Sequence, residues 1–171
     1  MKLNKGFWFL IVLAFLGIMT SRAAYADSGS FFSITHSAPD FDLPTFDASK
    51  NFTKKDLNAC ASLVVFWASW CGTCHQEHSF LMELHDHNKI PIYGIDYADN
   101  SDDASAFLSN KGNPYKILAQ DLDGQTANNF GINGVPESFL IDKKGKILYR
   151  HRGALTREAW ENNILPLIQS C

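Results

Sequence analysis

The hydrophobic pattern of the chain predicts a buried strand near its middle. Residues 62–68 (SLVVFWA) form a continuous run of apolar, β-branched and aromatic side chains after Ser62. An alternating pattern marks a strand with one face in water, whereas an unbroken apolar run is typical of a strand buried on both faces. We therefore expect residues 62–68 to lie in the centre of a parallel or mixed sheet.

Helical spacing follows this strand and recurs twice. From Cys71 to His87 the apolar residues Phe80, Leu81 and Leu84 fall on one stripe. Residues 102–111 read as a helix that Gly112-Asn113-Pro114 ends. The last helix is expected over 156–169, with Thr156 as its cap and an interruption near Pro166, and a short one over 54–59.

The remaining apolar segments predict strands in a fixed order. Residues 31–43 alternate but contain Pro39, which favours an extended leading segment or edge strands. We expect strands at 90–97, 115–119, 137–142 and 147–151, a hairpin loop at 143–146, a turn at 47–51 and a loop at 129–134. This order predicts an α/β fold whose mixed central sheet carries helices on both faces.

The first 26 residues have the pattern of an export signal. A basic start (Lys2, Lys5) precedes the uncharged run 6–19, and Ala24-Tyr25-Ala26 offers small residues to a signal peptidase. The run is short for a membrane span, which takes about 20 apolar residues, although an uncleaved anchor stays open as the alternative. We expect a signal peptide at 1–26 and a domain at 27–171, in a compartment where disulfides persist.

Composition narrows the function. The 171 residues include 15 Lys and Arg against 18 Asp and Glu, for a net charge of −3. The absence of a basic run argues against a nucleic-acid partner. Residues 27–171 suffice for one domain with its own core, and four cysteines are too few for a disulfide-rich scaffold.

Cys71 and Cys74 form a CxxC pair where the buried strand gives way to a helix. The first turn of a helix has unpaired N–H groups and a partial positive charge, which lower the pKa of a thiol there. Cys71 is therefore the expected nucleophile, attacking a disulfide of another protein to form a mixed disulfide. Cys74, one turn later, would attack that bond and release the reduced partner.

Other interpretations of the pair stay open. Cys71–His75 (CGTCH) also matches the signature of covalent haem attachment, with His75 as the iron ligand. A metal site could add His78 and His85 to the cysteines, but a second CxxC pair is missing. A permanent structural disulfide would close so short a loop that it would stabilise the fold little.

Longer segments resemble known proteins. Phe66–Cys74 (FWASWCGTC) is similar to the active-site segment of thioredoxin-like proteins, and Gly134–Asp142 (GVPESFLID) to their cis-proline loop. The match runs from about Pro39 to Ile168. More narrowly the chain resembles the CcmG/DsbE family, through Gly94–Tyr97 (GIDY), Gly112–Tyr115 (GNPY), Gly134–Glu137 (GVPE) and Tyr149–Gly153 (YRHRG).

This resemblance implies a thioredoxin-like three-layer fold and a periplasmic thiol:disulfide oxidoreductase of cytochrome c maturation. Its client would be apocytochrome c, whose haem-attachment cysteines it keeps reduced, or a thiol partner of the maturation machinery. A DsbD-type transmembrane reductase would supply the electrons. We expect no metal or other cofactor, and either a soluble protein or one tethered to the inner membrane. A general exported reductant or oxidant with other clients is the alternative.

The resemblance also implies roles for single residues. Pro136 would be the cis-proline facing the cysteines, and the backbone of Val135 would pair with an extended substrate segment. Val65 stands where thioredoxin has a buried aspartate, so Glu77 and Glu137 are the expected proton acceptors for Cys74. The other expected contacts to substrate are Trp70, Gly72 and Thr73, and Gly72 stands where a proline is common in the family.

Cys60 and Cys171 remain. Cys60 precedes the central strand and Cys171 ends the last helix, so the expected topology brings both to the pole of the sheet opposite the CxxC pair. A structural bridge between them would close a long loop, with a stabilisation of about 4–5 kcal/mol in the loop-entropy model. Two unpaired thiols are the alternative.

Overall fold

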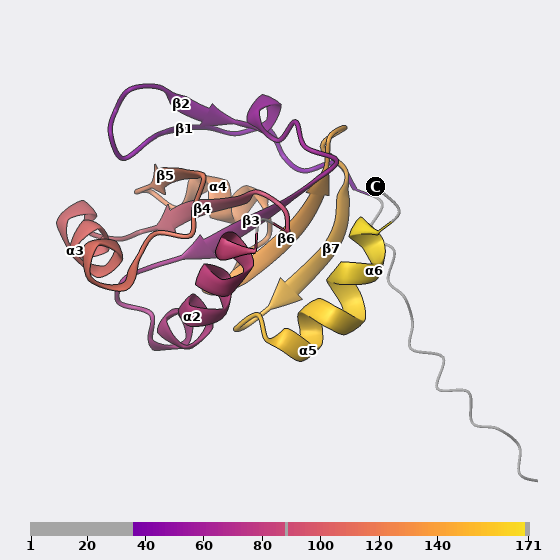
Figure 1. The fold of residues 1–171 in the computed structure, drawn as a ribbon. Helices are drawn as coiled ribbons and strands as arrows, with labels where there is room; N and C mark the ends of the chain where they lie inside the picture. The colour runs from indigo at the N-terminus through magenta and orange to yellow at the C-terminus, as the bar shows by residue number, and fades with distance from the viewer. Residues whose placement is uncertain (1–35, 88, 170–171) are drawn as a thin grey trace, which may run out of the picture. The chain divides into compact units, whose positions relative to one another are not determined.

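The structure is a computed structural model of the chain, and it describes residues 36–87 and 89–169 (Figure 1). The predicted order of strands and helices is confirmed. In chain order the elements are β1 (Asp42–Pro44), β2 (Asn51–Thr53), a 3₁₀ turn (Lys54–Asp56), β3 (Ala61–Trp67), α2 (Gly72–Asp86), β4 (Ile92–Tyr97), α3 (Ser101–Lys111), β5 (Ile117–Asp121), α4 (Gln125–Asn129), β6 (Glu137–Asp142), β7 (Ile147–Arg152), α5 (Arg157–Ala159), a π-helical turn (Trp160–Ile164) and α6 (Leu165–Ile168).

The main sheet is mixed, and β3 is its central strand. The strand order is β5-β4-β3-β6-β7. Strands β3, β4 and β5 are parallel, while β6 runs antiparallel to both β3 and β7. Every residue of β3 is buried, as its unbroken apolar run predicts. Because β3 is the middle strand, the loop that follows it lies at the centre of the end of the sheet where β3, β4 and β5 have their C-termini.

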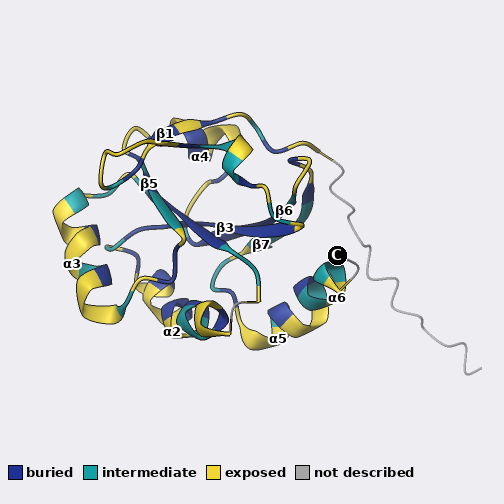
Figure 2. Cartoon of the chain, turned by 45° about the horizontal axis from the view of Figure 1, so that its top comes forward, coloured by how far each residue is buried: buried dark blue, intermediate teal, exposed yellow. Residues whose placement is uncertain are grey.

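Two apolar clusters cover the faces of this sheet. Figure 2 shows the buried central strand, β3, between the elements that carry them. Alternate residues of β3 point to opposite sides: Leu63, Val65 and Trp67 to one layer, Val64 and Phe66 to the other. The first layer contains α2, α3 and the C-terminal helical segments, and the second contains β1, β2 and α4. The expected three-layer thioredoxin-like α/β fold is thus confirmed, with α2 packed directly against the central strand.

Some local predictions were wrong. The expected turn at 47–51 includes the first residue of β2, a three-residue strand that holds Phe52 in the core against Tyr93. The short helix 54–59 is a 3₁₀ turn that ends at Asp56. Helix α4 is absent from the prediction because it has only five residues and its N-cap is Gly124, which has no side chain. The carboxylates of Asp121 and Asp123 cap it instead, accepting hydrogen bonds from backbone N–H groups of the first three helical residues.

Two of our predictions concern residues that the structure does not describe. These are the signal peptide or anchor at 1–26 and the position of Cys171. In residues 36–87 and 89–169, no helix is long and apolar enough to cross a bilayer.

Candidate active site

The two cysteines of the CxxC motif lie at the start of α2 and form a disulfide. Cys71 is the N-cap of the helix, and its sulfur accepts a hydrogen bond of 3.1 Å from the backbone N–H of Cys74. Both cysteines are largely buried, with 5% and 4% exposed. An N–H group and the positive end of a helix both stabilise a negative sulfur, so the reduced form favours a thiolate at Cys71.

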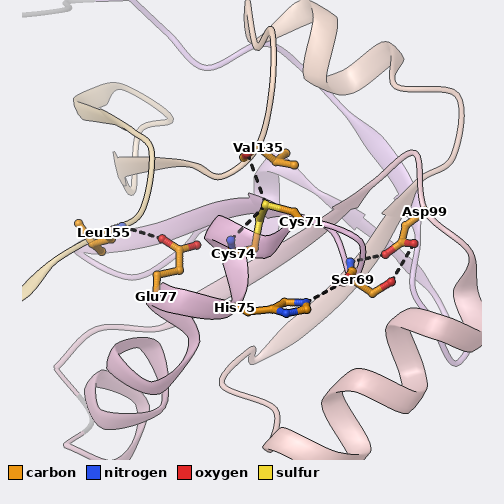
Figure 3. The surroundings of a disulfide bond; sticks show 8 residues. All are labelled: Ser69, Cys71, Cys74, His75, Glu77, Asp99, Val135 and Leu155. Carbon is orange, nitrogen blue, oxygen red and sulfur yellow. Dashed lines mark hydrogen bonds between the residues drawn. A yellow bond between two sulfur atoms is a disulfide. The ribbon is translucent and has the colours of Figure 1, made fainter.

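The loop before β6 lies beside this disulfide (Figure 3). The Val135–Pro136 peptide bond is cis, in agreement with the sequence analysis. The carbonyl oxygen of Val135 is 3.5 Å from the sulfur of Cys71. Strand β6 then begins at Glu137, paired with Phe66 of β3. The pairing of β6 with β3 therefore holds the loop against the first cysteine.

Glu77 lies one turn after Cys74 and is buried, with 2% exposed. One carboxyl oxygen accepts a hydrogen bond of 2.7 Å from the backbone N–H of Leu155, and the other has no partner among the described residues. Burial raises the pKa of Glu77 to about 7, although the Leu155 bond acts in the opposite direction. A carboxyl with such a pKa can take up and release a proton near neutral pH.

Glu137 is also buried, but its carboxylate is engaged. Nε and Nη2 of Arg150 both contact Oε2, at 2.7 and 2.6 Å, and Arg152 lies 3.7 Å from Oε1. These charge-assisted hydrogen bonds occupy the carboxylate. Of the two glutamates expected to serve Cys74, Glu77 has the free oxygen.

The residues expected to meet a substrate surround the disulfide at the surface. Trp70 is 59% exposed, and its indole N–H donates to the carbonyl of Ala98 over 3.2 Å. Gly72 and Thr73 are exposed and Val135 is half-buried. The other tryptophan of the motif, Trp67, lies in the core and packs on Phe107 and Tyr115. The surface around the disulfide thus has one large exposed aromatic ring, that of Trp70, which a hydrogen bond holds in place.

Comparison with known proteins agrees with this geometry. The sequence pattern of the Redoxin family matches residues 35–165. The chain belongs to this family. It is 39% identical to the probable thiol:disulfide interchange protein DsbE-2 of Pasteurella multocida, over 72% of this chain and 68% of the relative. Identity to DsbE of Pseudomonas fluorescens is 35%, over 95% and 89% of the two chains.

A solved structure of a DsbE protein has a similar fold. The crystal structure of a putative DsbE from Chlorobium tepidum matches with a TM-score of 0.69 and 31% identity, over 78% of this chain and 96% of that one. The chain is a thiol-disulfide oxidoreductase of the DsbE type, as the resemblance to the CcmG/DsbE family implies.

The histidines of α2 in this DsbE-type protein contact backbone carbonyls. His75 Nε2 lies 2.7 Å from the oxygen of Ser69, and its ring stacks on Phe107 at 4.6 Å. His78 and His85 meet carbonyls at the end of α3 and after it, those of Lys111, Gly112 and Pro114. Within the described ranges no three His, Cys, Asp or Glu residues form a cluster that could hold a metal ion.

Cys60 is held in a disulfide. Cys171 lies outside the described residues, so the pairing of these two cysteines stays a prediction.

Three residues near the site have no role in the sequence analysis: Ser69, Asp96 and Asp99. Asp99 accepts hydrogen bonds from Ser69, two residues before Cys71, and Asp96 is fully buried beside it. One signal was available, since Asp96 is an acidic residue within the apolar run 90–97.

Proposed function

We propose that this DsbE-type protein is an exported reductant that keeps the haem-attachment cysteines of apocytochrome c reduced during cytochrome c maturation. The observation that carries the proposal is the hydrogen bond from the Cys74 N–H to the sulfur of Cys71. This bond favours the Cys71 thiolate, and a stabilised thiolate is the group that attacks a disulfide.

The proposed reaction moves two electrons from the protein to its client. The Cys71 thiolate attacks one sulfur of a client disulfide, forms a mixed disulfide and releases the other client sulfur as a thiolate. Cys74 then loses its proton to Glu77 and attacks the sulfur of Cys71. The mixed disulfide breaks, the second client sulfur leaves, and the Cys71–Cys74 disulfide remains.

Several contacts support this sequence of steps. Glu77 is the acceptor for the Cys74 proton, since it lies one turn away on α2 and has an oxygen without a partner in the described part of the chain. The backbone of Val135 binds an extended client segment beside Cys71, and Trp70, Gly72 and Thr73 are exposed to the same segment. Pro136 holds the Val135 carbonyl against the disulfide, and Glu137 anchors the start of β6 through Arg150.

The oxidised protein must be reduced before each new cycle. A DsbD-type transmembrane reductase would supply two electrons to the Cys71–Cys74 disulfide. The export signal proposed for residues 1–26 puts residues 27–171 in the periplasm, either released or tethered to the inner membrane.

The test begins with the reduction potential of the pair, measured by equilibrating the protein with reduced and oxidised glutathione. A potential well below that of the periplasmic oxidants is expected for a reductant. A potential near theirs would make the protein an oxidant and overturn the proposal.

A second experiment tests the client. Cells without this protein should assemble less cytochrome c, and added thiol or the intact gene should restore assembly, while a C71S variant should not. Normal assembly in such cells, with a low potential, would favour the alternative of a general reductant with other clients.

A further inference from the structure

Asp96 is a buried carboxyl that no hydrogen-bond donor reaches within residues 36–87 and 89–169. It lies in β4 opposite Trp67, the last residue of β3, and is 0% exposed. Among the described residues neither of its oxygens has a donor within reach, and the group beside it is another carboxyl, that of Asp99. An isolated carboxylate is very costly in such a place. Asp96 is therefore neutral, and it carries a proton.

Asp99 has the opposite environment. Its carboxylate accepts hydrogen bonds from the backbone N–H of Ser69 (2.5 Å), the hydroxyl of Ser69 (3.0 Å) and the backbone N–H of Asn100 (2.7 Å). All three partners are donors, so the carboxyl of Asp99 is a hydrogen-bond acceptor here. When two carboxyls adjoin, a protonated one can donate to the other, so a protonated Asp96 would be the donor and Asp99 the acceptor. Burial, followed by the charge of Asp99, raises the pKa of Asp96 to about 8.

The carboxylate of Asp99 lies beside the segment that presents Cys71, and Figure 3 shows it bonded to Ser69, two residues before the cysteine. Ser69 is held by Asp99 on one side, and its carbonyl oxygen lies 2.7 Å from Nε2 of His75 on the other. Trp70 donates to the carbonyl of Ala98 in the same loop after β4. The loop after β4 therefore fixes the two residues that precede Cys71, and this fixes the sulfur relative to the first N–H groups of α2.

We propose that Asp96 is a positioning residue of the dithiol site, because it donates its proton to the Asp99 carboxylate and so holds Ser69 and Trp70 in place before Cys71. The inference rests on the proposed role of Cys71 as the attacking thiolate. Asp96 does not touch the sulfur; it acts through Asp99 and Ser69. When Asp96 ionises, two like charges meet, and the hold on Ser69 weakens.

Other titratable groups face the same region. Asp99 comes from the loop after β4, and Tyr115 comes from the segment before β5, close enough for Asp96 to act on its phenol. Glu77 of α2 acts on the same phenol from its own position. Since Glu77 titrates near neutral pH, any pH profile assigned to Asp96 has to be measured without it.

The experiment compares two substitutions in the reduced full-length chain. Asp96→Asn keeps a donor for Asp99 without a titrating group, and Asp96→Leu removes the donor at similar volume. The readout is the rate at which iodoacetamide alkylates Cys71 at pH 6. Asp96→Leu is expected to slow alkylation by about tenfold, the scale of one hydrogen bond to a charged group, and Asp96→Asn to restore most of the rate.

The pH profile separates a proton from a merely structural side chain. In an E77Q background, the alkylation rate of Cys71 should show an inflection near the pKa of Asp96, about 8, that D96N removes. D121N is the matched control, because the carboxylate of Asp121, a buried aspartate at the end of β5, bonds to α4. Its backbone carbonyl accepts from Ala98 in the loop after β4, and the substitution keeps that bond. It should lower stability and leave the alkylation rate unchanged.

Two results would overturn the inference. Equal rates in D96L, D96N and the unsubstituted chain would show that Asp96 does not position Cys71. Equal losses in D96N and D96L would show that the carboxyl acts as a charge and not as a donor. If D96L does not fold, persistence of the inflection in D96N overturns the inference by itself. Alkylation requires no client, so these results stand apart from any failure of the proposed reductant role.

Discussion

The carboxyl of Glu77 accepts a hydrogen bond from the backbone N–H of Leu155, 78 residues further along the chain. The bond ties the first half of α2 to the loop between β7 and the C-terminal helical segments. It also leaves the second oxygen of Glu77 without a partner among the described residues. Glu77 is thus fixed in position by one oxygen, and the other is free to exchange a proton.

This arrangement gives a first prediction for E77Q. Glutamine keeps the size of the side chain and can still accept from Leu155, but it cannot take a proton from Cys74. We expect the step in which Cys74 resolves a mixed disulfide to slow by about a hundredfold at pH 7, the lower end of the range for a lost general base. Stopped-flow tryptophan fluorescence during reduction of oxidised glutathione measures this rate.

A matched control lies on the same helix. Glu83 is partly exposed and pairs with Arg157 at the surface. E83Q should leave the resolving step unchanged. If E77Q also leaves it unchanged between pH 6 and 8, Glu77 is not the proton acceptor.

The two buried acids predict how stability depends on pH. Unfolded carboxyls ionise near pH 4, whereas folded Glu77 and Asp96 keep their protons up to about pH 7 and 8. The folded state then binds more protons, so stability falls as pH rises through this interval. The free energy of unfolding of the oxidised protein in urea should therefore fall less with rising pH in the E77Q/D96N double variant than in the unsubstituted chain. The difference should grow by up to about 1.4 kcal/mol per pH unit for each group.

Asp47 provides a control of opposite sign. Hydrogen bonds from Thr45 and Ser49 lower its pKa to about 2. Its stabilisation is present at neutral pH and lost as pH falls toward that value, so D47N should be less stable at pH 7 and converge with the unsubstituted chain in acid. A double variant that keeps the full decline in stability from pH 5 to 8 would contradict the assignment to Glu77 and Asp96.

A third prediction concerns Arg150, whose guanidinium holds the buried Glu137 carboxylate and the carbonyl of Gly131. R150M leaves Glu137 with only the longer contact to Arg152. We expect a loss of about 2–4 kcal/mol in the free energy of unfolding, since breaking a buried pair exposes the full cost of the remaining charge. Guanidinium unfolding measures it.

The pair between Arg157 and Glu83 is the control, because it lies at the surface. R157M should change stability by about 0–1 kcal/mol. Equal losses of stability in R150M and R157M would show that the buried Glu137 pair contributes no more to stability than a surface pair.

The parts of the fold that could be predicted are those whose signal is local. The apolar run of β3 and the spacing in α2 each lie within one segment, so the sequence indicates both. Helix α4 could not be predicted, because it is only five residues long, its N-cap is a glycine, and its capping bonds go to Asp121 and Asp123 outside the usual N-cap position.

The active site likewise contains residues that a local sequence motif predicts and residues that it does not. Cys71, Cys74 and Pro136 belong to short motifs that can be recognised in order along the chain. The bond from Ser69 to Asp99 joins loops after two neighbouring strands, and no short motif contains both residues. The pairing of Glu137 with Arg150 was accessible in principle, because the predicted hairpin places them on adjacent strands.

The last prediction concerns the close packing behind the site at Gly94 of β4. A Cβ at this position would lie 2.7–2.9 Å from the near atoms of the Tyr115 ring. That ring is buried and stacked on Trp67, so it cannot move away freely. We expect G94A to lower the free energy of unfolding by about 1–3 kcal/mol, the usual cost of overpacking. G72A, which has nothing within 4 Å of its Cβ, should stay within about 0.5 kcal/mol of the unsubstituted chain in the same urea titration. Equal stability of the two variants would mean that Tyr115 can move aside, and that the wall of the core behind the dithiol is not rigid.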